Sequence, residues 1–114
     1  LDLSNTRIAK LASLPKSLMI LNLKDCQDVP AEEFEKLDAF SHIKKLDLSN
    51  TRIAKLASLP KSLKVLDLRN CHFIDQELEQ LKVFKHLHQI YLPKTFEGNP
   101  IVQSLQLNKN IIFI

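Results

Sequence analysis

Cysteine and histidine are the residues of this chain that could supply nucleophilic or metal chemistry. There are two cysteines, Cys26 and Cys71, and four histidines, at positions 42, 72, 86 and 88. A cysteine beside a histidine can form a thiolate nucleophile, and zinc takes three or four sulfur, nitrogen or oxygen ligands from the protein. The pair His86 and His88 supplies only two, at a surface position, and no other cysteine or histidine is near them in the sequence. We therefore expect no catalytic residue, no metal site and no cofactor.

The carboxylates and glycines add no further chemistry. The acidic runs AEEFEKLD and DQELEQ place Glu near Lys at three or four residues, which is typical of the solvated face of a helix. Phosphate-binding loops are rich in glycine, whereas Gly98 is the only glycine. The net charge of +3 is too small to indicate a nucleic-acid partner. No apolar run approaches the roughly 20 residues that cross a bilayer, so we expect neither a nucleic acid nor a membrane as partner.

An internal sequence repeat predicts the secondary-structure elements that position these residues. The segment LDLSNTRIAKLASLPKSL begins at Leu1 and occurs again, unchanged, from Leu46. Repetition of this kind is typical of stacked structural units. Pairs of apolar residues two apart recur along the chain and predict short strands. The pairs are Leu1/Leu3, Leu21/Leu23, Leu46/Leu48, Leu66/Leu68, Ile90/Leu92 and Leu105/Leu107, and they are followed by Thr6, Cys26, Thr51, Cys71, Thr95 and Asn110.

This pattern resembles the leucine-rich repeat, L-x-x-L-x-L-x-x-N/C, over nearly the whole chain. The resemblance implies an α/β fold, a leucine-rich repeat solenoid with a curved parallel sheet on its concave face and helices and extended segments on its convex face. We expect residues 1–114 to form a single leucine-rich repeat domain of five to six repeats. The short repeats are similar to the L-P-x-x-L type, and NCHFIDQELEQLKVFKHLHQIYL is similar to the cysteine-containing repeats of F-box proteins.

The longer repeats are expected to carry helices on the convex side. Asp75 is the predicted N-cap of a helix through Lys85, with Leu78, Leu81 and Phe84 on one stripe. The segment after Pro30 repeats that stripe with Phe34, Leu37 and Phe40.

In the leucine-rich repeat pattern the ninth position turns inward, so the Thr, Cys and Asn residues that follow the predicted strands are expected to face the core. The two cysteines of this column are two repeats apart. At about 4.8 Å per strand they lie about 10 Å from each other, which is too far for a disulfide. We predict that Cys26 and Cys71 are buried and reduced. Reduced thiols favour a cytoplasmic location.

The ends of the chain lack the caps that usually close a solenoid. Leu1 falls inside a predicted strand and the sequence stops in IIFI. We expect a piece of a longer array, or end-to-end self-association through Leu1–Leu3 and Ile111–Ile114. The step from Ile90 to Leu105 is short for a repeat, and it leaves the path of residues 93–104 open.

Function is expected on the concave face, in the columns of side chains between the inward leucines. The predicted final members of these columns are Gln106, Asn108 and Lys109. A protein partner is expected to bind Lys45, Asp47, Asp67, Arg69, Asn70, His88, Tyr91 and Lys94. Arg69 and Tyr91 are the predicted anchors, because Tyr and Arg are enriched at binding hot spots.

Two other functions stay open. The first is a structural or designed repeat scaffold without a natural ligand. The second, which the F-box resemblance implies, is the substrate-recognition part of a larger ubiquitin ligase. The sequence does not say whether its origin is natural or designed.

Overall fold

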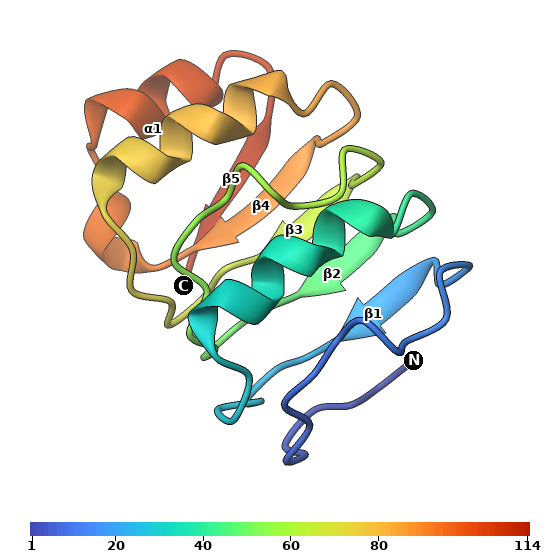
Figure 1. The fold of residues 1–114 in the computed structure, drawn as a ribbon. Coiled ribbons are helices and arrows are strands. Elements are labelled where there is room, and N and C mark those ends of the chain that lie inside the picture. The colour runs from blue at the N-terminus through green and yellow to red at the C-terminus, as the bar shows by residue number, and fades with distance from the viewer.

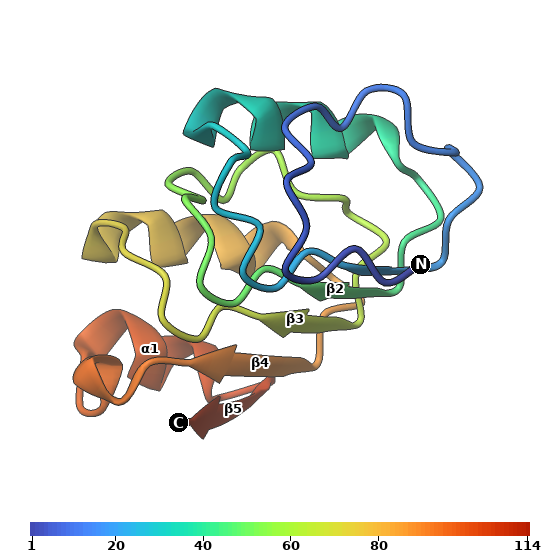
Figure 2. The ribbon, with the colours of Figure 1, turned by 90° about the horizontal axis from the view of Figure 1, so that it is seen from below.

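A single parallel sheet forms the frame of the molecule. The computed structural model describes residues 1–114 and arranges five strands in sequence order. The strands are β1 (Ile20–Asn22), β2 (Lys45–Asp47), β3 (Val65–Asp67), β4 (Gln89–Leu92) and β5 (Asn110–Phe113). An isolated bridge between Asp2 and Asn22 continues the sheet before β1. The helical segments lie on one side of the sheet (Figures 1 and 2), and we call the other side the open face.

The apolar residue at the centre of each strand points to the helical side. Leu21, Leu46, Leu66 and Ile90 are partners in register on successive strands and are buried, and Ile111 continues the row. They belong to, or pack against, one core cluster of 27 buried residues. Burial of this apolar area is the main force that stacks the repeats. The parallel sheet that the resemblance to the leucine-rich repeat implies is confirmed, whereas the curvature of a solenoid stays a prediction.

A left-handed residue ends each of the first four strand positions. Asn5, Asp25, Asn50 and Asn70 have φ of 59°, 61°, 54° and 55°, a region that Asn and Asp tolerate better than other non-glycine residues. The next residue is buried at Cys26, Thr51 and Cys71, as predicted, whereas Thr6 at the end of the stack is exposed. The Thr51 hydroxyl, for example, donates to the Leu48 carbonyl at 2.7 Å.

The turn after β4 differs from the prediction. The corresponding pair is Lys94 and Thr95, and lysine does not favour a left-handed backbone. The chain instead enters a short 3₁₀ helix, η3 (Lys94–Phe96). The predicted inward turn at Thr95 is therefore wrong.

The two long segments on the helical side of the sheet are 3₁₀ helices, η1 (Ala31–Ala39) and η2 (Asp75–Val83). Their buried residues recur every three positions, as in Phe34, Leu37 and Phe40. That period is the 3.0 residues per turn of a 3₁₀ helix. The predicted N-cap role of Asp75 is wrong: Asp75 is the first helical residue, Ile74 precedes it, and no side chain caps the segment.

The C-terminal strand lies later in the sequence than predicted. Leu105 is the last residue of a short α-helix, α1 (Pro100–Leu105), and Leu107 follows that helix. Ile111 pairs with Ile90 in the register of β4 and β5. Ile112 and Ile114 therefore replace Gln106 and Asn108 on the open face. Lys109 is buried, and its ammonium donates to the carbonyls of Phe84 and Leu87 at 2.8 and 3.0 Å.

Candidate protein-binding site on the open face

A row of Asp and Asn side chains crosses the open face at the carboxyl ends of the first strands. Each accepts a hydrogen bond from the backbone N–H two residues later. The pairs are Asp2 with Ser4, Asn22 with Lys24, and Asp47 with Ser49, each at 2.9 Å, and Asp67 with Arg69 at 3.0 Å. These Asx turns satisfy amides that the ending strand leaves unpaired. Asp47 and Asp67, predicted as partner-binding residues, thus also shape the backbone.

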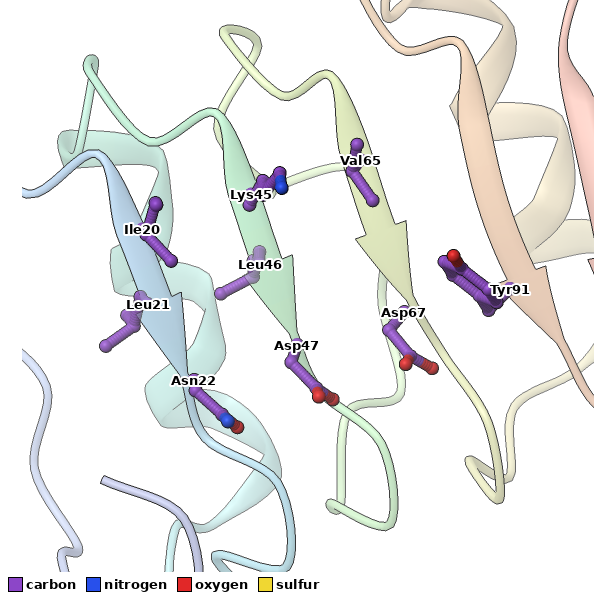
Figure 3. A pocket seen from close by; sticks show the side chains of 9 residues that line it. All are labelled: Ile20, Leu21, Asn22, Lys45, Leu46, Asp47, Val65, Asp67 and Tyr91. Carbon is purple, nitrogen blue, oxygen red and sulfur yellow. The ribbon is translucent and has the colours of Figure 1, made fainter. Parts of the chain in front are cut away.

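A shallow hollow of about 210 Å³ lies on the open face across β1 to β4 (Figure 3). Its lining residues are Ile20, Leu21, Asn22, Lys45, Leu46, Asp47, Val65, Asp67 and Tyr91. Ile20, Lys45 and Val65 share one row of the sheet register, and Asn22, Asp47, Asp67 and Tyr91 share a second. The first row therefore gives the hollow two apolar walls and one lysine. The second row gives it polar groups and one aromatic ring.

Arg69 is held against the sheet by two neighbours. Its Nε lies 3.0 Å from both carboxylate oxygens of Asp67, and its Nη2 lies 2.5 Å from Oδ2. The hydrogen bond to Asp67 raises the pKa of Arg69. The guanidinium carbon lies 5.4 Å from the centre of the Tyr91 ring, within cation–π range. Since Asp67 is only 7% exposed, this ion pair is part of the folded sheet.

Tyr91 is fixed at its other end as well. Its hydroxyl accepts a hydrogen bond from Gln89 Nε2 at 2.6 Å. With Arg69 over the ring, the phenol has one defined position at the edge of the hollow. A side chain that is already ordered loses little entropy when a partner packs against it.

A second hollow of about 230 Å³ lies beyond the Asx turns. It is lined by Lys24, Asp25, Ser49, Asn50, Arg69, Asn70 and Ile114. Asn50 donates from Nδ2 to Asp25 Oδ1 at 2.6 Å, so one side of this hollow is tied together. Asp67 lines the first hollow and its ion-pair partner Arg69 lines the second.

The predicted site residues fall into three groups. Lys45, Asp47, Asp67 and Tyr91 line the first hollow, and Arg69 and Asn70 line the second. His88 and Lys94 are exposed and line neither.

The predicted set left out ten residues that line the two hollows, among them Ile20, Val65 and Ile114. Ile20 and Val65 form apolar walls, and a signal was present, because each directly precedes an inward leucine and must point the opposite way. Ile114 was missed because the last strand was placed in the wrong register.

The two thiols lie in the core. Cys26 and Cys71 are buried as predicted, and each Sγ donates to a strand carbonyl, that of Leu3 or Leu48, at 3.0 Å. Burial raises the pKa of Cys71 to about 11. A thiol with that pKa is almost fully protonated at neutral pH and is a poor nucleophile. No three His, Cys, Asp or Glu side chains are grouped so that they could hold a metal ion.

Comparison with known proteins supports the repeat assignment. Residues 62–84 match the family model described as Leucine Rich Repeat. This stretch contains β3 and η2, so a leucine-rich repeat is confirmed there, and the parallel sheet carries the same strand register to both sides. No curated protein matches the chain at a significant level. None of the helices has the length and apolar character needed to cross a bilayer. The similarity to F-box proteins stays a prediction.

Proposed function

We propose that this chain is a non-enzymatic protein-interaction module that binds a protein partner through its open face, the face predicted to be concave. The observation that carries this proposal is the placement of all helical segments on one side of the sheet (Figure 2). Polar, charged and aromatic side chains on the other side therefore have no layer of helices over them. Leucine-rich repeats typically serve as interaction modules.

The shape of the open face suits a protein surface better than a small molecule. Pockets for small ligands usually enclose about 300–1,000 Å³, whereas the two hollows next to the predicted site residues are near 210 and 230 Å³. A larger hollow of about 530 Å³, between Lys55 and Phe73, contains none of the predicted site residues. A shallow surface with an ordered tyrosine and apolar walls offers sites for individual partner side chains. The charges of Lys45 and Asp47 add selectivity for the partner's orientation.

Tyr91 is the proposed anchor, and Arg69 is proposed to act through it. Arg69 orients the ring and neutralises Asp67, so the anchor is a unit of three side chains. Removal of Arg69 leaves the buried carboxylate of Asp67 without an ion-pair partner, which destabilises the folded protein. We therefore expect Arg69 to affect stability as well as binding.

A paired set of variants tests the proposal. The double change Ile20→Ser and Tyr91→Ala removes apolar contact area from the open face. Leu107→Ser is the control, because Leu107 is 86% exposed and lies outside both hollows. In affinity capture from lysate followed by quantitative mass spectrometry, the double variant should lose specific partners that the control retains. Identical sets of captured proteins would contradict the proposal.

The unchanged eighteen-residue copy favours a second candidate, a scaffold without a natural ligand. That function predicts no protein whose capture depends on Ile20 or Tyr91. The F-box resemblance supports a substrate-recognition role in a ubiquitin ligase only if ligase subunits appear among the captured proteins. A cytoplasmic location is proposed on the two buried thiols alone.

A further inference from the structure

A row of basic side chains borders the open face where the chain enters the strands. We call Lys44, Lys45, Lys64 and His88 the basic rim. Backbone hydrogen bonds align three of them: Lys64 N–H donates to the Lys44 carbonyl at 2.8 Å, and His88 N–H donates to the Lys64 carbonyl at 3.1 Å. Neighbouring strands are about 4.8 Å apart. Lys44, Lys64 and His88 therefore stand side by side on three successive strands.

No acidic residue belongs to this edge of the molecule. The connections that enter the five strands, residues 15–21, 39–46, 59–66, 84–90 and 105–111, contain none of the 13 Asp and Glu residues. The three ion pairs of the structure are Lys36 with Glu33, Arg69 with Asp67 and Lys82 with Glu79. Like charges on adjacent strands repel each other, so an anion bound along the basic rim would be favourable.

Of the four other lysines in these connections, Lys16, Lys61 and Lys109 have structural partners, and Lys85 has none within the chain. Lys16 and Lys61 donate to the carbonyls of Ala12 and Ala57 and lie over the rings of Phe40 and Phe84, at 4.5 and 4.6 Å. Lys109 is buried against two carbonyls. In contrast, the ammonium groups of the basic rim make no hydrogen bond or ion pair within the chain. They are free for a ligand next to the first hollow, which Lys45 also lines.

We infer that the basic rim binds a short run of acidic side chains in the protein partner, an inference that rests on the proposed function. Three features favour an acidic peptide segment over a nucleic acid. The rim contains no arginine, the residue that binds phosphate in bidentate fashion. Asp47 and Asp67 lie in the next row and confine the positive strip to a narrow band. Arg69 covers one face of the nearby Tyr91 ring, and no other aromatic side chain lines either hollow to continue a stack of bases.

The test uses the whole chain, a short fluorescent peptide of alternating glutamate and serine, and an oligothymidylate of equal charge. Fluorescence anisotropy measures affinity for the protein, for the double variant Lys44→Gln with Lys64→Gln, and for the control Lys10→Gln with Lys55→Gln. The control pair is exposed, removes the same charge and lies in the duplicated arc away from the rim. We expect the peptide affinity to fall about tenfold in the rim variant, since two exposed ion pairs are lost together, and less than about twofold in the control.

Amide chemical shifts and melting temperatures complete the experiment. Peptide-induced shifts should cluster at Lys44, Lys45, Lys64 and His88, and both double variants should melt close to the original protein. The inference is overturned if the peptide does not bind, if both double variants lose affinity equally, or if the oligonucleotide binds the rim more tightly than the peptide. If the rim variant still captures every partner that Ile20→Ser with Tyr91→Ala loses, the inference fails while the proposed function stands.

Discussion

Glu33 accepts a hydrogen bond from the backbone N–H of Leu11 at 3.0 Å, although 22 positions separate the two residues. Glu77 repeats the contact with Leu56 at 2.9 Å. In both cases the first turn of a 3₁₀ helix is bonded to the extended arc of the preceding repeat. The extended arcs have few backbone partners of their own, so these carboxylates satisfy buried amides and join one repeat to the next.

Replacing Glu77 should weaken the contact between its repeat and the preceding one. Glu77→Ala leaves the N–H of Leu56, a fully buried residue, without an acceptor, which costs about 1–3 kcal/mol of unfolding free energy. Urea denaturation measures the change. Glu79→Ala is the matched control, because Glu79 is exposed and pairs only with Lys82, and it should change stability by less than about 0.5 kcal/mol. Equal losses in the two variants would mean that the Leu56 contact contributes nothing.

The loss of stability at acidic pH should depend in part on Glu33. The hydrogen bonds from Lys36 and from the Leu11 amide lower the pKa of Glu33 below its ordinary value of 4.5. The stability from this group is therefore present above pH 4.5 and is lost as the pH falls through the lower, folded-state pKa. Glu33→Gln should be less stable than the original protein at pH 7, and the gap should narrow below pH 4.5. A gap that stays constant with pH would contradict the assignment.

Asp47 should tolerate an amide but not a methyl group. Asn22 holds the same Asx turn on the neighbouring strand with an amide side chain, so Asp47→Asn should keep the melting temperature nearly unchanged. Asp47→Ala removes the acceptor for Ser49 N–H and should cost about 1 kcal/mol. Thermal unfolding followed by circular dichroism compares the two. If Asn and Ala destabilise equally, the charge and not the turn is what matters at this position.

The buried thiols should resist labelling in the folded protein. Cys71 has a pKa near 11 and a side chain packed in the core, so a thiol reagent at pH 8 should label it much more slowly in buffer than in denaturant. Mass spectrometry of samples taken over time measures the rate of labelling under each condition. Rapid labelling of the native protein would show that the second helix-backed repeat opens locally.

Much of the sheet could be predicted from the sequence. The Leu-x-Leu alternation located β1 to β4, because one face of each strand is buried and the register is fixed by that pattern. The left-handed turns at Asn5, Asp25, Asn50 and Asn70 were not predicted, although Asn and Asp tolerate that conformation better than other non-glycine residues. The pattern failed at Leu105/Leu107, where the alternation is the same but Asn99 and Pro100 begin a helix. Asn99 accepts a hydrogen bond from Ile101 N–H at 2.8 Å and Pro100 stands at the first helical position.

Neither the type of helix in η1 and η2 nor the hydrogen bonding of Arg69 could be predicted from the sequence. A stripe of three apolar residues at three-residue spacing fits both a 3₁₀ and an α-helix, since the two differ by only about 0.6 residue per turn. The alternation of side chains along a strand predicts that Arg69 and Asp67 point to the same face of the sheet. Whether the guanidinium bonds to Asp67 or extends into solvent depends on the packing of Tyr91, which strand β4 brings in from 22 positions away.

The most direct measurement of the central claim is site-specific photo-crosslinking from the two sides of the sheet. A photo-reactive amino acid is placed in the position of Ile20, on the open face, or of Leu107, outside it, and each protein is irradiated in lysate. We predict that the Ile20 position forms a discrete crosslink to a protein whose capture the Ile20→Ser and Tyr91→Ala variant abolishes, and that the Leu107 position does not. A crosslink to that protein from the Leu107 position and none from Ile20 would contradict binding through the open face.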